Sequence, residues 1–471
     1  MKILRLHIVR LLLMTLVVLP AATSCYNYDE EEIISNSNQY INITISVRTG
    51  QYLATRGLPN GGEDGDGREK GIDTRENEVE GVTLIFYRNE TGVNASNAES
   101  TPIDFVAYYP TKKDDAYTPH TGSHYPDEVY YTTGEQELNS ALDATQQYHL
   151  LVVANVDLTS EITTSSKLAD VRDKVYDAAL YQDGVTNANI FVMTSADDNV
   201  LTFDYYTDDK VHNRRIFKFD NIHIERLAAR IDYWAKGAEY SDAYDHKGYV
   251  YSVGSSTDKF VLTSIEPFNL NTGNEYLFKR TNDATNPYLA NETTTNWVLD
   301  PYIKTAAAHP DYISYPLTSV AAKTDALDIS METMQSSKIT VDSKDDIILA
   351  YPKENTISAT TPYYYYATGL AFEGYYYRNG ATTGGERRVY YHFIRHQGEQ
   401  DNAYDALNAA QLTAFDKSTT IGGSGTAMNF GIVRNNIYRV SIESISPEAG
   451  TIKIKIEEKH WRHVDHPVIY L

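Results

Sequence analysis

The sequence predicts an all-β protein with two β-sandwich domains in tandem. Two observations predict this class: short segments in which apolar and polar residues alternate are common, and helical periodicity is scarce. Gly, Asn, Asp and Thr stand between these segments, as they do in the turns of sandwiches. Length is a third observation, because 471 residues suffice for two or three domains of about 100–200 residues each.

The first expected strand shows the alternation most clearly. Ile41, Ile43, Ile45 and Val47 alternate with four polar residues, which predicts a strand that is buried on one face. A helix is expected at 168–180. Further strands are expected at 79–87, 148–156, 189–194, 200–203, 249–253, 260–265, 347–351, 388–395, 438–445 and 451–457.

A domain boundary is expected at residue 215. The segment 205–215 is polar and charged, whereas 217–234 begins a new apolar segment. We therefore divide the chain into an N-terminal sandwich at 57–215 and a C-terminal sandwich at 216–471.

Charge and cysteine content exclude two classes of function. The formal net charge is −23, from 41 basic and 64 acidic residues, so the surface repels phosphate backbones and we expect no nucleic-acid partner. A single cysteine excludes a disulfide framework and any zinc or iron–sulfur site built from cysteines.

Residues 1–24 are similar to the signal peptide of a bacterial lipoprotein. A basic start precedes an apolar stretch at 11–20 that is too short to span a membrane. The segment 22–25 (ATSC) resembles a lipobox, so the cysteine at its end, Cys25, is the expected lipidation site. Acyl chains such as palmitate would anchor the protein to the outer membrane, since each buried CH2 contributes about 0.8 kcal/mol. The alternative is a plain signal peptide with an incidental cysteine.

The sequence predicts no catalytic residue, no metal site and no cofactor. The glycine-rich stretch 422–425 has no helix signal after it and does not match a nucleophile elbow. His460, His463 and His466 are spaced by three in a strand-like segment, so neighbouring members fall on opposite faces. We therefore expect a protein that is not an enzyme.

Tyrosine is unusually frequent, with 39 Tyr against 13 Phe. Clusters occur at 363–366 and 375–377, and at Tyr390 and Tyr391. Two interpretations stay open: the side chains alternate between the core and the wet face of strands, or they form an adhesive patch.

Two motifs in the second half of the chain are the most specific. Residues 224–231 (IERLAARI) lie near the expected boundary, and residues 431–438 (GIVRNNIY) lie near the C-terminus. With the lipobox, the strand at 41–48, and the segments 148–156 and 190–195, they resemble in order and spacing the fimbrillin family, the type V pilins of Bacteroidales. The resemblance covers most of the chain after the signal peptide.

The resemblance implies a fold, a location and a set of partners. The two sandwiches would be transthyretin-like, and the lipoprotein precursor would travel to the cell surface. A protease specific for Arg or Lys would remove residues 25–56 with the first strand, whose apolar side chains are Ile41, Ile43, Ile45 and Val47. The C-terminal strand of the next subunit would fill the hydrophobic groove. Partners would be other fimbrial subunits, including tip and anchor proteins, and a ligand on a host or bacterial surface.

The cleavage site should be a basic residue on an exposed loop. Residues 57–71 are rich in Gly and acidic residues, which predicts such a loop, and Arg56 stands at its head. Arg56 is therefore our first choice, and Arg75, just before the strand expected at 79–87, is the alternative.

The C-terminal octapeptide 464–471 (VDHPVIYL) is the candidate donor strand. Its apolar, β-prone residues would either insert into a neighbour or form an internal edge strand, a position that the proline at 467 suits. The donor residues would be Val464, Val468, Ile469, Tyr470 and Leu471.

The sequence therefore predicts a structural subunit of a cell-surface fimbria that supports adhesion. The alternatives are a tip or accessory adhesin, an anchor subunit of the same fimbriae, and a surface glycan-binding lipoprotein. The adhesion ligand, the processing protease and the position of the subunit in the fibre do not follow from the sequence.

Overall fold

The computed structural model confirms the all-β class. Among the residues that the structure describes, strands make up almost all of the regular structure, beside the short helix α3 (Leu168–Arg172) and the 3-10 helix η1 (Thr74–Asn77). It describes residues 38–47, 74–88, 97–114, 129–140, 142–143, 146, 148–176, 190–195, 199–201, 206–209, 214–271, 274–281, 298–299, 301, 347–355, 367–394, 404–405, 407–408, 431–446 and 452–460.

One sheet of eleven strands is built from the first half of the chain, in the order β3-β2-β7-β9-β12-β1-β5-β4, with β10, β11 and β6 on its branches. Its strands are β1 (Asn38–Val47), β2 (Gly81–Tyr87), β3 (Ile103–Pro110), β4 (Lys112–Lys113), β5 (Val129–Thr132), β6 (Gln136–Glu137), β7 (Tyr148–Ala154), β9 (Met193–Ser195), β10 (Asn199–Leu201), β11 (Tyr206–Asp209) and β12 (Arg214–Arg226).

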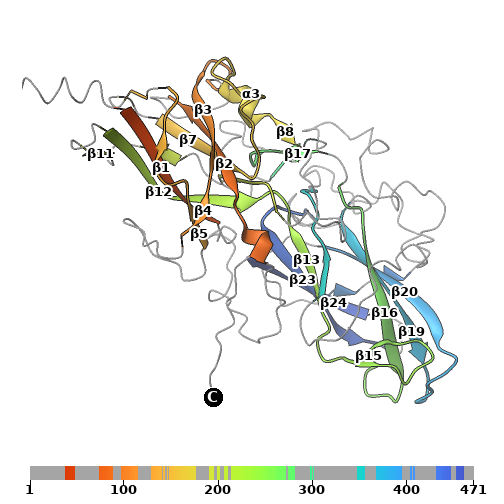
Figure 1. Cartoon of the computed structure of the whole chain (residues 1–471). Coiled ribbons are helices and arrows are strands. Elements are labelled where there is room, and N and C mark those ends of the chain that lie inside the picture. Colours follow the sequence, from red (N-terminus) through yellow and green to blue (C-terminus); the bar gives the residue numbers. More distant parts are fainter. Residues whose placement is uncertain are drawn as a thin grey trace, which may run out of the picture.

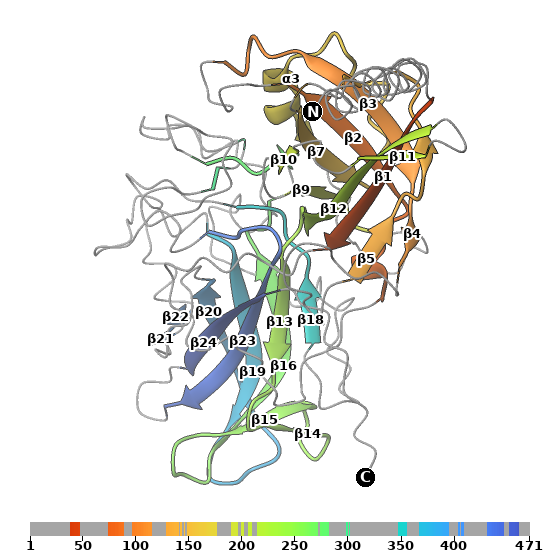
Figure 2. The same ribbon diagram turned by 90° about the vertical axis from the view of Figure 1, so that its left-hand side faces the viewer.

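The second half of the chain forms a five-stranded sheet, β18-β13-β23-β24-β21, and a six-stranded sheet, β14-β15-β16-β19-β20-β22. Their strands are β13 (Arg230–Trp234), β14 (Glu239–Ser241), β15 (Gly248–Ser252), β16 (Lys259–Phe268), β18 (Ile347–Ala350), β19 (Gly369–Tyr377), β20 (Glu386–Phe393), β21 (Tyr404–Asp405), β22 (Leu407–Asn408), β23 (Asn436–Ile445) and β24 (Ile452–His460). In both views these strands lie to one side of the strands of the first half (Figures 1 and 2).

A two-stranded sheet joins the halves, because β8 (Val175–Tyr176) from the first half pairs with β17 (Glu275–Tyr276) from the second. An apolar cluster also joins the two halves. It packs Leu168 and Val171 of α3 with Leu277 and Phe278. The two halves therefore share buried surface as well as a covalent connection.

The expected boundary at residue 215 lies within β12, which pairs with β1 and β9 of the first sheet as far as Arg226. The chain changes sheet at 227–229, between β12 and β13. The prediction of a helix over 168–180 was wrong for residues 173–176, and residues 177–180 lie outside the described residues. The helix ends at Arg172, and the chain continues into β8.

The expected first strand, β1, is an interior strand of its sheet. It runs parallel to β12 on one side and antiparallel to β5 and β6 on the other. The prediction that only one face is buried was therefore incomplete, because Thr44 and Ser46 on the second face are also buried. An interior strand that is covered on both faces has no wet side along this part of its length.

Candidate functional site

The apolar face of β1 packs into the largest apolar core of the first half. We call the place that β1 occupies in this core the groove. Ile41, Ile43, Ile45 and Val47 have exposed fractions between 0% and 3%. They belong to one cluster with Phe217, Phe219, Ile222 and Ile224 of β12, and with Tyr131 of β5. The alternation seen in the sequence thus identifies the residues that this core receives from β1.

Polar contacts hold the second face and the backbone of β1. The hydroxyl of Ser46 lies 2.7 Å from Nδ1 of His223 on β12. Thr132 donates to Oδ1 of Asn42 at 2.9 Å, and the backbone N–H of Ile43 donates to the Thr133 hydroxyl at 3.0 Å. These contacts reach β12 and the β5 segment, so β1 is bonded on both sides through side chains as well as through ladders.

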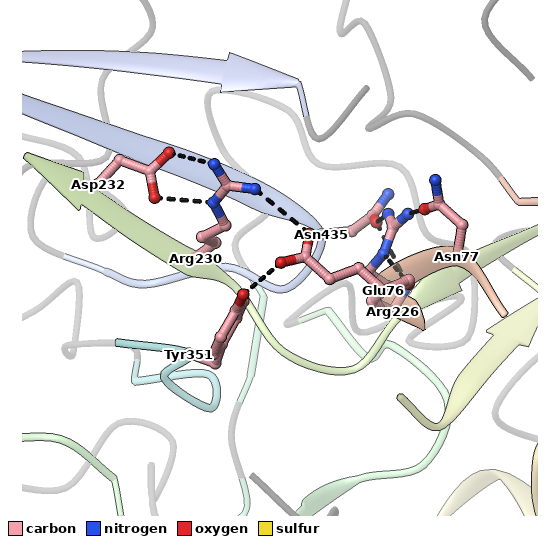
Figure 3. A network of polar contacts seen from close by, with 7 residues as sticks. All are labelled: Glu76, Asn77, Arg226, Arg230, Asp232, Tyr351 and Asn435. Atoms are coloured by element: carbon pink, nitrogen blue, oxygen red, sulfur yellow. Dashed lines mark hydrogen bonds and ion pairs between the residues drawn. The ribbon is translucent and has the colours of Figure 1, made fainter. Parts of the chain in front are cut away.

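A buried polar cluster lies where the chain passes from the first sheet to the second (Figure 3). We call it the Glu76 cluster; its members are Glu76, Asn77, Arg226, Arg230, Asp232, Tyr351 and Asn435. They come from η1, the end of β12, the start of β13, the residue after β18 and the residue before β23. Five separate segments therefore meet in one hydrogen-bonded group.

Arg230 pairs with two carboxylates in this cluster. Its Nε and Nη2 donate to both oxygens of Asp232, at 2.7 Å and 2.6 Å, and its Nη1 donates to Glu76 at 3.3 Å. The hydroxyl of Tyr351 donates to the other oxygen of Glu76. Burial alone would lower the pKa of Arg230, but the attraction of Asp232 and Glu76 outweighs it and raises the pKa.

Arg226 binds neutral oxygens instead. Its Nε donates to the backbone carbonyl of Glu76 at 2.9 Å, its Nη2 to Asn77, and its Nη1 to Oδ1 of Asn435 at 2.9 Å. Burial lowers the pKa of Arg226 to about 10, against the attraction of Glu76. The guanidinium therefore stays charged at neutral pH and binds η1 to the residue that precedes β23.

A second buried group, the Glu275 cluster, contains Glu275, Glu354 and Arg434. Arg434 donates to Glu354 at 2.6 Å and to the carbonyls of Tyr276 and Leu277 at 2.5 Å and 3.0 Å. The backbone N–H of Glu354 donates to Oε2 of Glu275 at 3.4 Å, while Oε1 of Glu275 is buried without a hydrogen-bond partner. Burial raises the pKa of Glu275 to about 8, although Arg434 lowers it.

The two motifs that carry the resemblance supply both clusters. IERLAARI contains Glu225, Arg226 and Arg230, and VRNN contains Arg434 and Asn435. Glu225 forms a buried ion pair with Lys279 at 3.0 Å. Their partners Glu76, Glu275 and Glu354 were not predicted, because nothing in the local sequence distinguishes them from exposed carboxylates.

The chemistry of these clusters is structural. Both are buried, and their guanidinium groups are bound by carboxylates, carbonyls and side-chain amides. Within the described part of the chain, no group of three or more His, Cys, Asp or Glu could hold a metal ion. Among the same residues, no helix is long and apolar enough to cross a membrane.

The described tyrosines of the sequence clusters are mostly buried. Tyr376 and Tyr390 pack in the core of the second half, and Tyr377 and Tyr391 are also buried. Only Tyr375 among these residues is partly exposed, and it stacks on His246 with ring centroids 3.4 Å apart. The burial of these side chains agrees with the core interpretation rather than with an adhesive patch. Residues 363–366 lie outside the described residues.

The other predicted site residues are distributed as follows. Arg75 lies in η1, directly before the buried Glu76. Cys25, Arg56 and the donor residues Val464, Val468, Ile469, Tyr470 and Leu471 lie outside the described residues, so their roles stay predictions. The described part of the chain ends at His460, the last residue of β24.

Comparison with known proteins gives similarity in structure but not in sequence. No protein-family model matches the chain, and no curated protein matches it. The solved structures that are similar include the tip fimbrial protein Mfa3 of Porphyromonas gingivalis, a fimbrilin of the same species, and a fimbrial assembly protein of Parabacteroides distasonis.

These matches span nearly the whole of each protein at low identity. The solved Mfa3 chain, which is truncated at its C-terminus, is 11% identical with a TM-score of 0.42, over 90% of this chain and 100% of that truncated chain. The fimbrilin is 14% identical with a TM-score of 0.39, over 92% and 99%. The assembly protein is 9% identical with a TM-score of 0.34, over 89% and 98%. Fimbrial proteins are thus among the solved structures that are similar to this chain.

Proposed function

We propose that this protein is a structural subunit of a cell-surface fimbria that supports adhesion. In this proposal the precursor is a lipoprotein anchored through Cys25. Proteolysis removes the N-terminal segment with β1, and the C-terminal segment of another subunit takes the vacated place. The proposed chain is organised as a signal peptide at 1–24, a removed segment at 25–56 and two sandwich domains. The sequence predicted these domains at 57–215 and 216–471, whereas the strands change sheet at 227–229.

The position of β1 is the observation that carries the proposal. β1 is an interior strand that ends at Val47, and the proposed cleavage site, Arg56, follows it in the sequence. A cut between 48 and 73 would therefore separate a central strand from the rest of the chain. The loss would leave unpaired those edges of β12 and β5 that face β1, and it would uncover the apolar groove; an unpaired edge is a template for another strand.

The amount of apolar surface that β1 buries in the groove supports strand exchange. Ile41, Ile43, Ile45 and Val47 are fully or almost fully buried. At about 1.5–3 kcal/mol for each side chain, they represent roughly 6–12 kcal/mol of burial. This is comparable with the whole stability of a typical domain, so an apolar replacement strand would bind strongly. Val464, Val468, Ile469, Tyr470 and Leu471 supply such side chains.

The location of Arg75 favours Arg56 as the cleavage site. The bond after Arg75 leads directly into Glu76, which is buried and bound by Arg226, Arg230 and Tyr351. Cleavage there would require η1 to leave its cluster, and the new ammonium group would lie beside two buried guanidinium groups. A cut after Arg56 leaves this cluster intact.

The test is the N-terminal sequence of the protein recovered from the cell surface, together with its size on a gel after mild heating. We expect a new terminus at Gly57 and a ladder of multimers. Arg56→Ala should abolish both, whereas the matched variant Arg75→Ala should change neither. A chain that ends at His463 should be cut normally but form no ladder.

The opposite results would overturn the proposal. A monomer that keeps an acylated Cys25 would instead indicate an anchor subunit or a binding lipoprotein. Loss of processing in Arg75→Ala but not in Arg56→Ala would move the cleavage site to η1.

A further inference from the structure

We propose that the contact between Arg226 and Asn435 couples the groove occupied by β1 to the end of the β23–β24 hairpin, after which the proposed donor segment follows in the sequence. The proposal rests on the proposed function, in which one subunit uses the groove as acceptor and the C-terminal segment as donor. It makes Arg226 and Asn435 positioning residues for strand exchange.

The groove reaches almost to Arg226. Residues of β1 pair with β12 along its length, and the last pair is Val47 with Ile224. Arg226 follows two residues later and ends β12. The occupant of the groove therefore pairs with β12 to within two residues of Arg226, where β9 pairs with the other edge of β12 through Ser195, Thr194 and Met193.

The open end of the β23–β24 hairpin lies next to Asn435 in the chain. Asn435 directly precedes β23, and the first residue of β23, Asn436, pairs with His460, the last residue of β24. Residues 461–471 follow His460. The position of Asn435 therefore sets the end of the hairpin from which the proposed donor departs.

Arg226 and Asn435 are joined at the backbone as well as at the side chains. Oδ1 of Asn435 accepts from the backbone N–H of Arg226 at 3.3 Å and from its Nη1 at 2.9 Å. The backbone N–H of Asn435 donates to the carbonyl of Ala228 at 2.8 Å. Asn435 has a φ of 60°, which asparagine tolerates better than most residues. A shift at the end of β12 must therefore move Asn435 or break these bonds.

The consequence is reciprocal coupling. An occupied groove stabilises the root of the donor segment, and a fixed root stabilises the acceptor strand, by the same factor. A subunit that has already received a strand would thus present its own donor in a defined position. Couplings of this kind typically change an equilibrium by about 5–150-fold.

The experiment uses hydrogen exchange of the full chain, measured by mass spectrometry on residues 436–440 and 456–460. Ile43→Ala weakens β1 in its groove. Leu84→Ala on β2 is the matched control, because Leu84 is equally buried in the same core but, among the described strands, β2 pairs with β3 and β7 and not with β12. Ile43→Ala should accelerate exchange at the root about tenfold more than Leu84→Ala. Ile43→Val replaces it if Ile43→Ala does not fold.

The variants Ile43→Ala and Leu84→Ala are then compared in a chain that also carries Asn435→Gly. Glycine keeps the positive φ and removes the side chain. The difference between Ile43→Ala and Leu84→Ala should disappear. It should persist with Asn155→Gly, because Asn155 also has a positive φ and binds Glu78 and Phe191 through its side chain, but lies outside this path.

Equal effects of Ile43→Ala and Leu84→Ala in the natural sequence would overturn the coupling. So would a difference that survives Asn435→Gly, or one that Asn155→Gly also removes. The measurement needs no fibre. A chain that shows the coupling but does not assemble after cleavage would therefore overturn the proposed function alone.

Discussion

Glu225 and Arg226 are consecutive residues at the end of β12 and enter different buried polar groups. Glu225 pairs with Lys279, whereas Arg226 binds Glu76, Asn77 and Asn435. Successive side chains of a strand point to opposite faces, so the end of one strand is fixed from both sides. Arg434 and Asn435 repeat the arrangement before β23, because Arg434 binds Glu354 and Asn435 binds Arg226.

Loss of Arg230 should destabilise the fold strongly. Arg230→Met leaves the buried carboxylate of Asp232 without its cation and removes the ion-pair partner of Glu76, which keeps the attraction of Arg226. Breaking a buried ion pair on one side typically costs about 3–5 kcal/mol. We expect a decrease of this size in the free energy of unfolding, measured in urea at pH 7.

The matched control is Arg378→Met. Arg378 pairs with Glu386 at 3.4 Å, but both side chains are more than half exposed. Exposed ion pairs contribute about 0–1 kcal/mol to stability, so the free energy of unfolding of this variant should stay close to that of the natural protein. Equal stabilities of the two variants would show that the Glu76 cluster is not charged as described.

Stability should depend on pH through Glu275. Burial raises its pKa to about 8, from an ordinary value of 4.5. Between these values the folded protein keeps a proton that the unfolded chain releases, so raising the pH favours unfolding through this residue. Its stabilising effect is complete below about pH 4.5 and is lost as the pH rises through 8.

Glu275→Gln isolates this contribution, because glutamine imitates the protonated side chain. The variant should match the natural protein near pH 5 and exceed it in stability above pH 8. The difference should grow by at most about 1.4 kcal/mol for each pH unit in between. Glu386→Gln is the control, because the exposed Glu386 has a pKa that Arg388 lowers. A constant difference between pH 5 and pH 9 would contradict the assignment of Glu275 as protonated.

The sequence was most informative where structure follows from local alternation. The period of two at Ile41–Val47 correctly marked a strand and the side chains that its core receives. The long strand β12 was not predicted as one element, since polar residues interrupt it and Asp220–Asn221 has the composition of a turn.

The polar clusters could not be predicted, because their members are far apart in sequence. Arg226 is 150 residues from Glu76 and 209 from Asn435. Arginine is also seldom fully buried, so the basic residues in IERLAARI and VRNN gave no sign of their environment. Only the folded chain shows that the two motifs bind each other.

A truncated side chain in β1 should weaken the full-length protein. Ile45 is about 1% exposed and lies in the largest core of the first half. Ile45→Ala should lower the free energy of unfolding by about 2–5 kcal/mol. Val175→Ala is the control, since Val175 is 40% exposed and should have little effect. If the two variants unfold at the same urea concentration, β1 does not occupy the groove in solution.

The contribution of Asn435 to the free energy of unfolding can be separated into a side-chain part and a backbone part. Asn435→Gly keeps the φ of 60° but leaves the N–H and Nη1 of Arg226 without their acceptor. This loss should cost about 1–3 kcal/mol.

Asn435→Ala should cost about 1–2 kcal/mol more than Asn435→Gly, because a Cβ disfavours positive φ. Asn379 provides the reference: it has a φ of 53° on an exposed turn. Asn379→Gly should be nearly neutral, and Asn379→Ala should show the backbone cost alone. Urea unfolding of the four variants tests both parts. If Asn435→Gly were as stable as the natural protein, the bond that joins β12 to the start of β23 would contribute no stability.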